Sequence, residues 1–353
     1  MLRPTILLLG LCIPAFSQGP VFQPKIGTTW TRSHDLEMHV KFDRISMEVN
    51  GQASDDTDFD IEVVSSNHLL VEDVILEWHP EGPRHLERTY LEVERERTAP
   101  IKMTVNEATV SSKIQAHGES PMLGERVNFR SEARGQSWLP TFAEGSAENL
   151  PSEWLTSLET NLDYSLLLPR KRSKAGARWN VDPKAFLMAL DTGHSMPFDF
   201  GADRGDDLPL WIGGVAEQPE LSNLWDSFET SRVRCTLMPQ RKAGHLRLLE
   251  IQVTATFHGD ADLSDWAMES ITRQGQGGEG LNVNSASQST VLTGSGVYLW
   301  DLDRRAMHSF HFRATAQFVR QQDVTAMTGD EEMHIALNTE GHFDLKVNAK
   351  LEK

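Results

Sequence analysis

Cysteine is nearly absent from this chain, whose 353 residues contain only Cys12 and Cys235. Cys12 falls within an apolar segment near the N-terminus that we expect to be removed. Cys235 would then be alone, which excludes a disulfide within the mature chain. Because it alternates with Val233 and Leu237, we expect a buried thiol rather than a nucleophile.

Long hydrophobic runs are also missing. The most apolar run, Thr5–Phe16, has ~12 residues, whereas a membrane-spanning helix needs about 20. With Arg3 before it and Ala15-Phe16-Ser17 at its end, it predicts a signal peptide over residues 1–17 and an exported protein, periplasmic or extracellular, without a transmembrane segment. A lipid anchor at Cys12 is the alternative, although Leu11 is larger than the residue a lipoprotein peptidase requires.

Basic residues are few, 34 against 51 acidic ones, which gives a net charge of −17. This balance argues against nucleic acids and anionic lipid surfaces as partners, since both need a positive field. Recognised catalytic signatures are missing as well: the chain has no H-E-x-x-H, no phosphate loop and no dinucleotide fingerprint after a strand. We therefore predict no cofactor and no enzymatic activity.

The nearest approach to a catalytic motif is Gly193-His194-Ser195. A nucleophile elbow needs a strand before the serine and a second glycine after it, but Pro197 occupies that glycine position. We therefore interpret Ser195 as an ordinary loop serine.

Metal sites are weakly indicated. Alternate acidic residues from Asp56 to Glu62 resemble a calcium loop, but the apolar residues between them indicate a strand. Asp260, Asp262 and Asp265 follow the end of a predicted strand and are the better calcium candidates. No set of histidines has the spacing of a known metal site.

Alternating apolar and polar residues are the clearest positive signal. Four C-terminal runs show a period of two, which is typical of half-buried antiparallel strands. They begin at Leu249, Phe310, Met333 and Phe343. We interpret the last two as a terminal hairpin that turns through Asn338–His342.

The N-terminal half shows the same alternation less regularly. The pattern beginning at Met38 changes phase at Asp43-Arg44, which indicates a bulge or a turn. A hairpin is expected through His79–Pro83. Between the β regions, Asp182-Pro183 marks the start of a short helix over Lys184–Leu190.

These patterns predict a β-rich α+β fold: a large curved antiparallel sheet, as a half-barrel or open barrel, with a few short helices. We expect an N-terminal β-rich half over residues 18–150 and a C-terminal half over 151–353, or one continuous domain over 18–353. Residues 273–290, rich in Gly, Gln, Ser and Asn, are expected to form a loop.

The layout resembles that of the LolA/LppX-type periplasmic carriers and is similar to that of uncharacterised exported β-rich bacterial proteins. Three features carry the resemblance: the export signal, the matching segments Gly27–Trp30 and Gly176–Trp179, and the terminal meander over Val297–Leu351. The resemblance implies a curved sheet wrapped around an apolar cavity.

The leading functional hypothesis is therefore binding of a hydrophobic or amphipathic ligand within the curved sheet. Aromatic and aliphatic residues of the predicted helices, strands and loops would line the cavity or belong to the core: Phe186, Leu187, Trp211, Leu224, Trp225, Phe228, Phe310, Phe312 and Phe318. One alternative is an envelope or secreted scaffold that meets a protein partner. Another is a glycan-binding module, for which Asp203, Asp206 and Asp207 near Trp211 are the only local indication.

Overall fold

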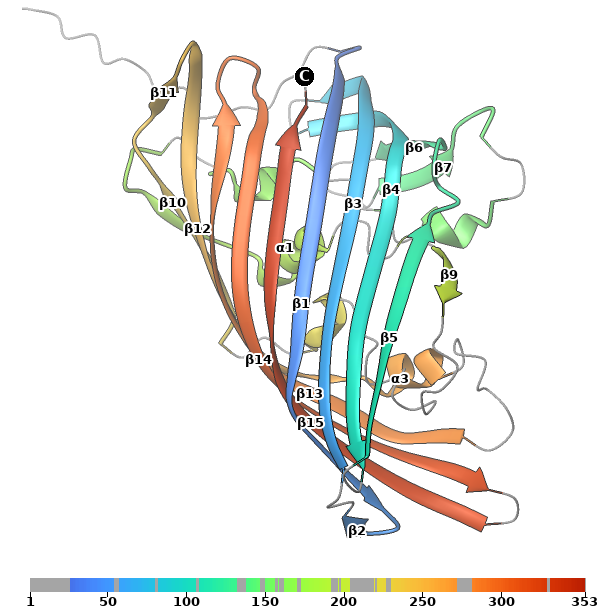
Figure 1. Ribbon diagram of the computed structural model, residues 1–353. Coiled ribbons are helices and arrows are strands. Elements are labelled where there is room, and N and C mark those ends of the chain that lie inside the picture. Colours follow the sequence, from blue (N-terminus) through green and yellow to red (C-terminus); the bar gives the residue numbers. More distant parts are fainter. Residues whose placement is uncertain are drawn as a thin grey trace, which may run out of the picture.

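The computed structural model is dominated by one antiparallel sheet of long, curved strands (Figure 1). The structure describes residues 26–53, 57–79, 82–105, 108–131, 138–146, 150–155, 158, 162–169, 173–191, 196, 198–203, 219, 221–226, 230–271, 281–328 and 331–352. The predicted signal peptide and the possible lipid anchor at Cys12 lie outside these residues.

Within the described ranges, the sheet contains 15 strands. The main hydrogen-bonded order is β7-β6-β4-β3-β1-β15-β14-β13-β12-β10-β8, while off this path β2 pairs with β1, β5 with β4 and β9, and β11 with β12. The strands are β1 (Thr29–Val49), β2 (Gln52–Ala53), β3 (Thr57–His79), β4 (Gly82–Val105), β5 (Ala108–Glu119), β6 (Arg126–Ser131), β7 (Trp138–Phe142), β8 (Arg178–Val181), β9 (Asp199–Asp203), β10 (Arg232–Leu237), β11 (Arg241–Ala243), β12 (Leu246–Asp262), β13 (Leu281–Asp301), β14 (Ala306–Thr328) and β15 (Glu331–Leu351).

The helices are short and lie on one side of this sheet, which we call the inner face (Figure 1). They are η1 (Ser152–Leu155), η2 (Ser165–Leu167), α1 (Pro183–Leu190), η3 (Leu221–Leu224) and α3 (Ser264–Ile271). In the described part of the chain, no helix has the length and apolar character needed to cross a membrane. The predicted β-rich fold with a large curved antiparallel sheet and few helices is confirmed.

Period-two alternation determines which residues face the core. In β14, the even-numbered residues from Phe310 to Phe318 are buried on the inner face, while the odd-numbered residues between them are exposed on the opposite, outer face. The same division holds in β1, β12 and β15. One side of the sheet is therefore apolar and covered by helices and loops, and the other is polar.

Two local predictions are confirmed, one in each half of the chain. The β1–β15 register shifts between Phe42 and Arg44, so the phase change in the sequence is a β-bulge. Helix α1 begins after Asp182, whose Oδ1 accepts a hydrogen bond from the backbone N–H of Ala185 at 2.8 Å.

The terminal hairpin prediction is wrong, because β15 runs without a turn from Glu331 to Leu351. Gly341, which suggested the turn, lies in the middle of that strand. A Cβ atom there would come within 2.4 Å of the carbonyl oxygen of Lys41 and 2.7 Å of Cζ of Phe318. The glycine accommodates a close approach of β1 and an aromatic ring rather than a turn.

The loop expected over 273–290 is also partly wrong. Residues from Leu281 onward belong to β13, which pairs with β14 along its length. The polar residues of this segment fit a strand because pairing with β14, and with β12 from Ser287 onward, overrides weak local propensity.

Strands from both halves of the chain form this sheet, since β1 pairs with β3 on one side and with β15 on the other. The two halves therefore meet at the β1–β15 ladder, in the centre of the sheet.

Candidate functional site

The residues predicted to line an apolar cavity pack against one another on the inner face. The ring centroids of Phe186 and Phe312 are 5.3 Å apart, and those of Trp225 and Phe257 are 5.4 Å apart. Seven of the predicted residues belong to one buried cluster: Phe186, Leu187, Leu224, Trp225, Phe310, Phe312 and Phe318. Trp211 and Phe228 lie outside the described residues.

The calcium candidates have structural roles. The Oδ1 atom of Asp262 accepts hydrogen bonds from Ser264, at 2.9 Å from the backbone N–H and at 2.7 Å from the hydroxyl. These bonds lower the pKa of the Asp262 carboxyl and fix it at the start of α3. Asp265 lies in the first turn of α3, and Asp260 is exposed at the end of β12. Among the described residues, no group of three or more His, Cys, Asp or Glu is arranged to hold a metal ion.

The remaining candidates give no site. Cys235 is buried, and burial raises the pKa of its thiol to about 12, so it stays protonated at neutral pH. Ser195, Asp206 and Asp207 lie outside the described residues, and Asp203 ends β9.

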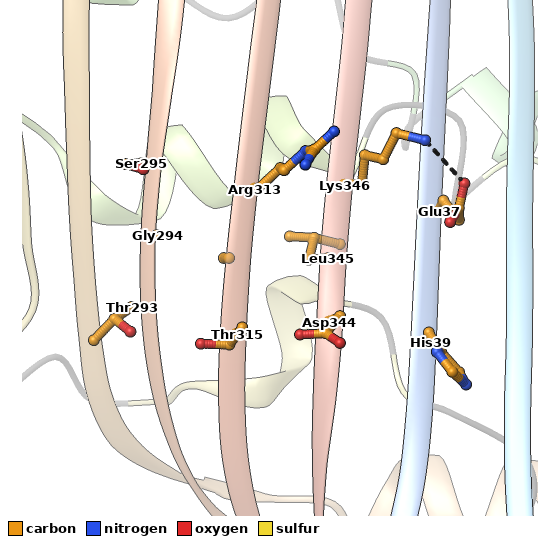
Figure 2. Close-up of a pocket in the computed structure, with 11 residues that line it drawn as sticks. Glu37, His39, Thr293, Gly294, Ser295, Arg313, Thr315, Asp344, Leu345 and Lys346 are labelled. Atoms are coloured by element: carbon orange, nitrogen blue, oxygen red, sulfur yellow. Dashed lines mark hydrogen bonds and ion pairs between the residues drawn. The ribbon is translucent and has the colours of Figure 1, made fainter.

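A hollow of about 720 Å³ lies on the outer face, over four adjacent strands (Figure 2). Its lining comprises Glu37 and His39 of β1, Asp344–Lys346 of β15, Arg313–Thr315 of β14 and Thr293–Ser295 of β13. Segments up to about 300 positions apart in the sequence thus meet at one place.

Strand register arranges the lining side chains in two parallel rows. In the first row, Arg313 is opposite Ser295 on one side and Lys346 on the other, and Lys346 is opposite Glu37. In the second row, Thr315 is opposite Thr293 and Asp344, and Asp344 is opposite His39. Figure 2 shows both rows on the same side of the sheet.

Small residues form the floor of the hollow. Gly294 has no side chain because Phe312 and Ala314 occupy the space on the inner face: a Cβ atom would lie 2.5 Å from Cζ of Phe312 and 2.7 Å from Cβ of Ala314. On the outer face, Thr293, Ser295 and Thr315 are short and exposed. The depression therefore results from short hydroxyl side chains beside long charged ones.

Some of the charged side chains in the hollow have a partner of opposite charge, and others do not. Nζ of Lys346 lies 3.3 Å from Oε2 of Glu37, and Nε2 of His39 is bonded to Oε1 of Glu62 on β3. Arg313 and Asp344 have no ion pair with any described residue. An arginine beside a lysine and three hydroxyl groups forms an environment suited to an oxyanion, because guanidinium donates in a fork that matches carboxylate or phosphate oxygens.

The sequence contains only a partial signal for this hollow. The alternation over 310–318 places Arg313 and Thr315 on the solvent side of a strand. Their neighbours depend on the pairing of β13, β14, β15 and β1, which alternation does not specify.

No protein-family model matches the chain, and no curated protein matches it. Among solved structures, it is similar to the outer membrane protein OprG of Pseudomonas aeruginosa, with 7% identity over 94% of this chain and 99% of the other and a TM-score of 0.25. It is also similar to an outer membrane channel from Pseudomonas putida F1, with 9% identity over 95% of this chain and 99% of the other and a TM-score of 0.17. At these scores, the similarity does not assign a function.

The comparisons correct two predictions. The structures found are outer membrane proteins and not LolA/LppX-type carriers, so the predicted resemblance is wrong. The hypothesis of a hydrophobic ligand within the curved sheet, with its scaffold and glycan alternatives, is wrong with it. Seven of the nine residues assigned to the cavity belong to the buried core cluster.

Proposed function

We propose that this protein binds a small molecule with an oxyanion, a carboxylate or a phosphate, in the hollow on its outer face. The observation that carries the proposal is the position of Arg313, in register between Lys346 and Ser295 at the centre of the hollow. We further propose that the protein is exported and that it acts by binding rather than by catalysis.

The local charge supports an anionic group. The whole chain carries −17, yet Arg313 and Lys346 lie side by side on neighbouring strands. Two cations directly opposite each other in a sheet repel unless an anion lies near them. Glu37 offsets the charge of Lys346, which leaves the guanidinium of Arg313 to a ligand.

The size and lining also support a small polar molecule. A volume of about 720 Å³ lies within the range of about 300–1,000 Å³ that is typical of small-molecule sites. The hydroxyls of Thr293, Ser295 and Thr315 donate and accept hydrogen bonds, which suits the oxygen atoms of such a ligand.

The test is a phosphate titration followed by ³¹P NMR, at constant ionic strength maintained with chloride. We expect saturable binding to the wild-type protein that weakens by about ten-fold or more in Arg313→Gln, since a hydrogen bond to a charged group contributes about 1.5–3 kcal/mol.

The matched control is Arg130→Gln, which removes an exposed outer-face arginine of β6, a strand that β4 and β3 separate from β1 and the hollow. It should bind phosphate as the wild-type protein does. Equal loss in both variants would show a nonspecific charge effect and contradict the proposal, as would the absence of saturable binding.

A further inference from the structure

We infer that the ligand of the outer hollow is a zwitterion, with its oxyanion at Arg313 and an ammonium group at Asp344. This inference rests on the proposed function and specifies its ligand class.

The charge balance of the lining carries the inference. Arg313 and Lys346 contribute two positive charges, and Glu37 and Asp344 contribute two negative ones, while His39 is bonded to Glu62 outside the lining. A hollow with no net charge attracts a purely anionic ligand through Arg313 alone. It suits a ligand whose own charges also cancel.

Asp344 supplies the second binding group. Its side chain is exposed in the hollow, and it forms no ion pair with a described residue. Its neighbours in register are the hydroxyl of Thr315 and His39. A carboxylate next to an oxyanion site weakens the binding of simple anions without preventing it, so it favours a ligand that also carries a cation.

The spacing of the two groups fits a short molecule. Arg313 and Asp344 are diagonal neighbours on adjacent strands, because Arg313 is opposite Lys346 and Thr315 is opposite Asp344. Diagonal neighbours in a sheet lie about 7–8 Å apart, within reach of long side chains. A ligand whose ammonium and oxyanion are separated by two or three carbon atoms spans the remaining gap once both side chains reach toward it.

The experiment compares matched pairs of probes on the full mature chain. O-phosphoethanolamine is compared with ethyl phosphate, and β-alanine with propionate, so that each pair differs in the ammonium group. We expect the zwitterion of at least one pair to bind on the order of ten-fold more tightly than its amine-free partner, as one charge-assisted contact allows.

The variants locate the two groups. Asp344→Asn should abolish the preference for the zwitterion while it retains binding of the amine-free partner, whereas Arg313→Gln should weaken both. Asp260→Asn, which removes an exposed outer-face carboxylate on β12, is the matched control and should keep the preference. Urea unfolding curves check that each variant is folded.

The outcomes separate the two proposals. Equal binding of both members of each pair, lost in Arg313→Gln, overturns the zwitterion and leaves the oxyanion site. A preference that survives in Asp344→Asn overturns the role of Asp344. Absence of binding by every probe overturns the proposed function and this inference together.

A further arm identifies the source of the zwitterion. Cosedimentation with phosphatidylethanolamine vesicles that is lost in Asp344→Asn supports a lipid headgroup, and binding of the free probes alone supports a dissolved solute.

Discussion

Histidines on the outer face of the sheet are joined to carboxylates across strands, and His68 has two such partners. Its Nδ1 lies 2.6 Å from Oδ1 of Asp35 on β1, and its Nε2 lies 3.1 Å from Oε2 of Glu92 on β4. Both nitrogens of an imidazole donate only when the ring is protonated. Burial alone lowers the pKa of His68, but the hydrogen bonds and charges of Asp35 and Glu92 outweigh it and raise the pKa above 6.5.

This arrangement predicts pH-dependent stability. Because the folded-state pKa is raised, the contribution of His68 is fully present below about pH 6.5 and is lost as the pH rises through the folded-state pKa. The side chains are substantially exposed, so we expect no more than about 1 kcal/mol. Urea unfolding at pH 5.5 and 8.5 should show a smaller difference in His68→Gln than in the wild-type protein.

His311→Gln is the control, since its Nδ1 is bonded to the amide oxygen of Asn348 at 2.9 Å rather than to a carboxylate. It should keep the wild-type pH dependence. An unchanged pH dependence in His68→Gln would show that the three-residue bridge does not form in solution.

At the scale of elements, a buried ion cluster joins the inner faces of three strands. Asp73 of β3 is completely buried and is bonded to Arg32 of β1 and to Arg88 of β4, whose Nε lies 2.6 Å from Oδ1. Asp73→Asn leaves two buried arginines without a countercharge. We expect a loss of about 3–5 kcal/mol in the free energy of unfolding, measured in urea.

Glu72→Gln is the matched control, because Glu72 lies on the outer face of the same strand. A change of less than about 0.5 kcal/mol is expected there. Similar small losses for both variants would mean that the cluster contributes little to stability.

Gly341 tests the continuity of β15. A methyl group in Gly341→Ala would collide with the backbone of β1 and the ring of Phe318, and we expect a loss of about 1–3 kcal/mol or more from overpacking. The comparison is Gly51→Ala, at a positive φ of 75° with open space around it, where only backbone strain of about 1–2 kcal/mol arises. A Gly341→Ala protein as stable as the wild type would contradict the close approach of β1 and Phe318 to this position.

The alternation of apolar and polar residues predicted the strands well, but it did not predict which strands pair with one another. The runs from Leu249 and Phe310 gave strands with the correct buried face, because one face of each strand is apolar. The segment Asn338–His342 was misread, because its glycine and polar residues resemble a turn until Phe318 and Lys41 are placed beside them. The outer hollow was missed for the same reason: Arg313, Lys346 and Glu37 become neighbours only through register.

At the scale of the whole molecule, the central β1–β15 ladder makes the two halves interdependent. Expressed separately, residues 18–150 would leave the β1 edge unpaired, and residues 151–353 would leave the β15 edge unpaired. We expect each fragment to aggregate or to lack cooperative unfolding by circular dichroism.

A protease site inserted at the exposed Gly244-His245 turn is the control. After cleavage there, the two pieces should stay associated and unfold together, because the cut leaves the central ladder intact. Cooperative unfolding of either separate half would show two independent domains.

The pairing of β1 with β15 also affects how the chain acquires its structure during synthesis. The first long strand of the sheet, β1, cannot complete its pairing until the last strand, β15, is made about 300 residues later. Until then, β1 can pair only with β2 and β3, and its other edge stays open to neighbouring chains. Contacts so distant in sequence make folding slow, on a timescale of about milliseconds to seconds for domains of this type. The nascent polypeptide therefore depends on being kept apart from its copies until translation is complete.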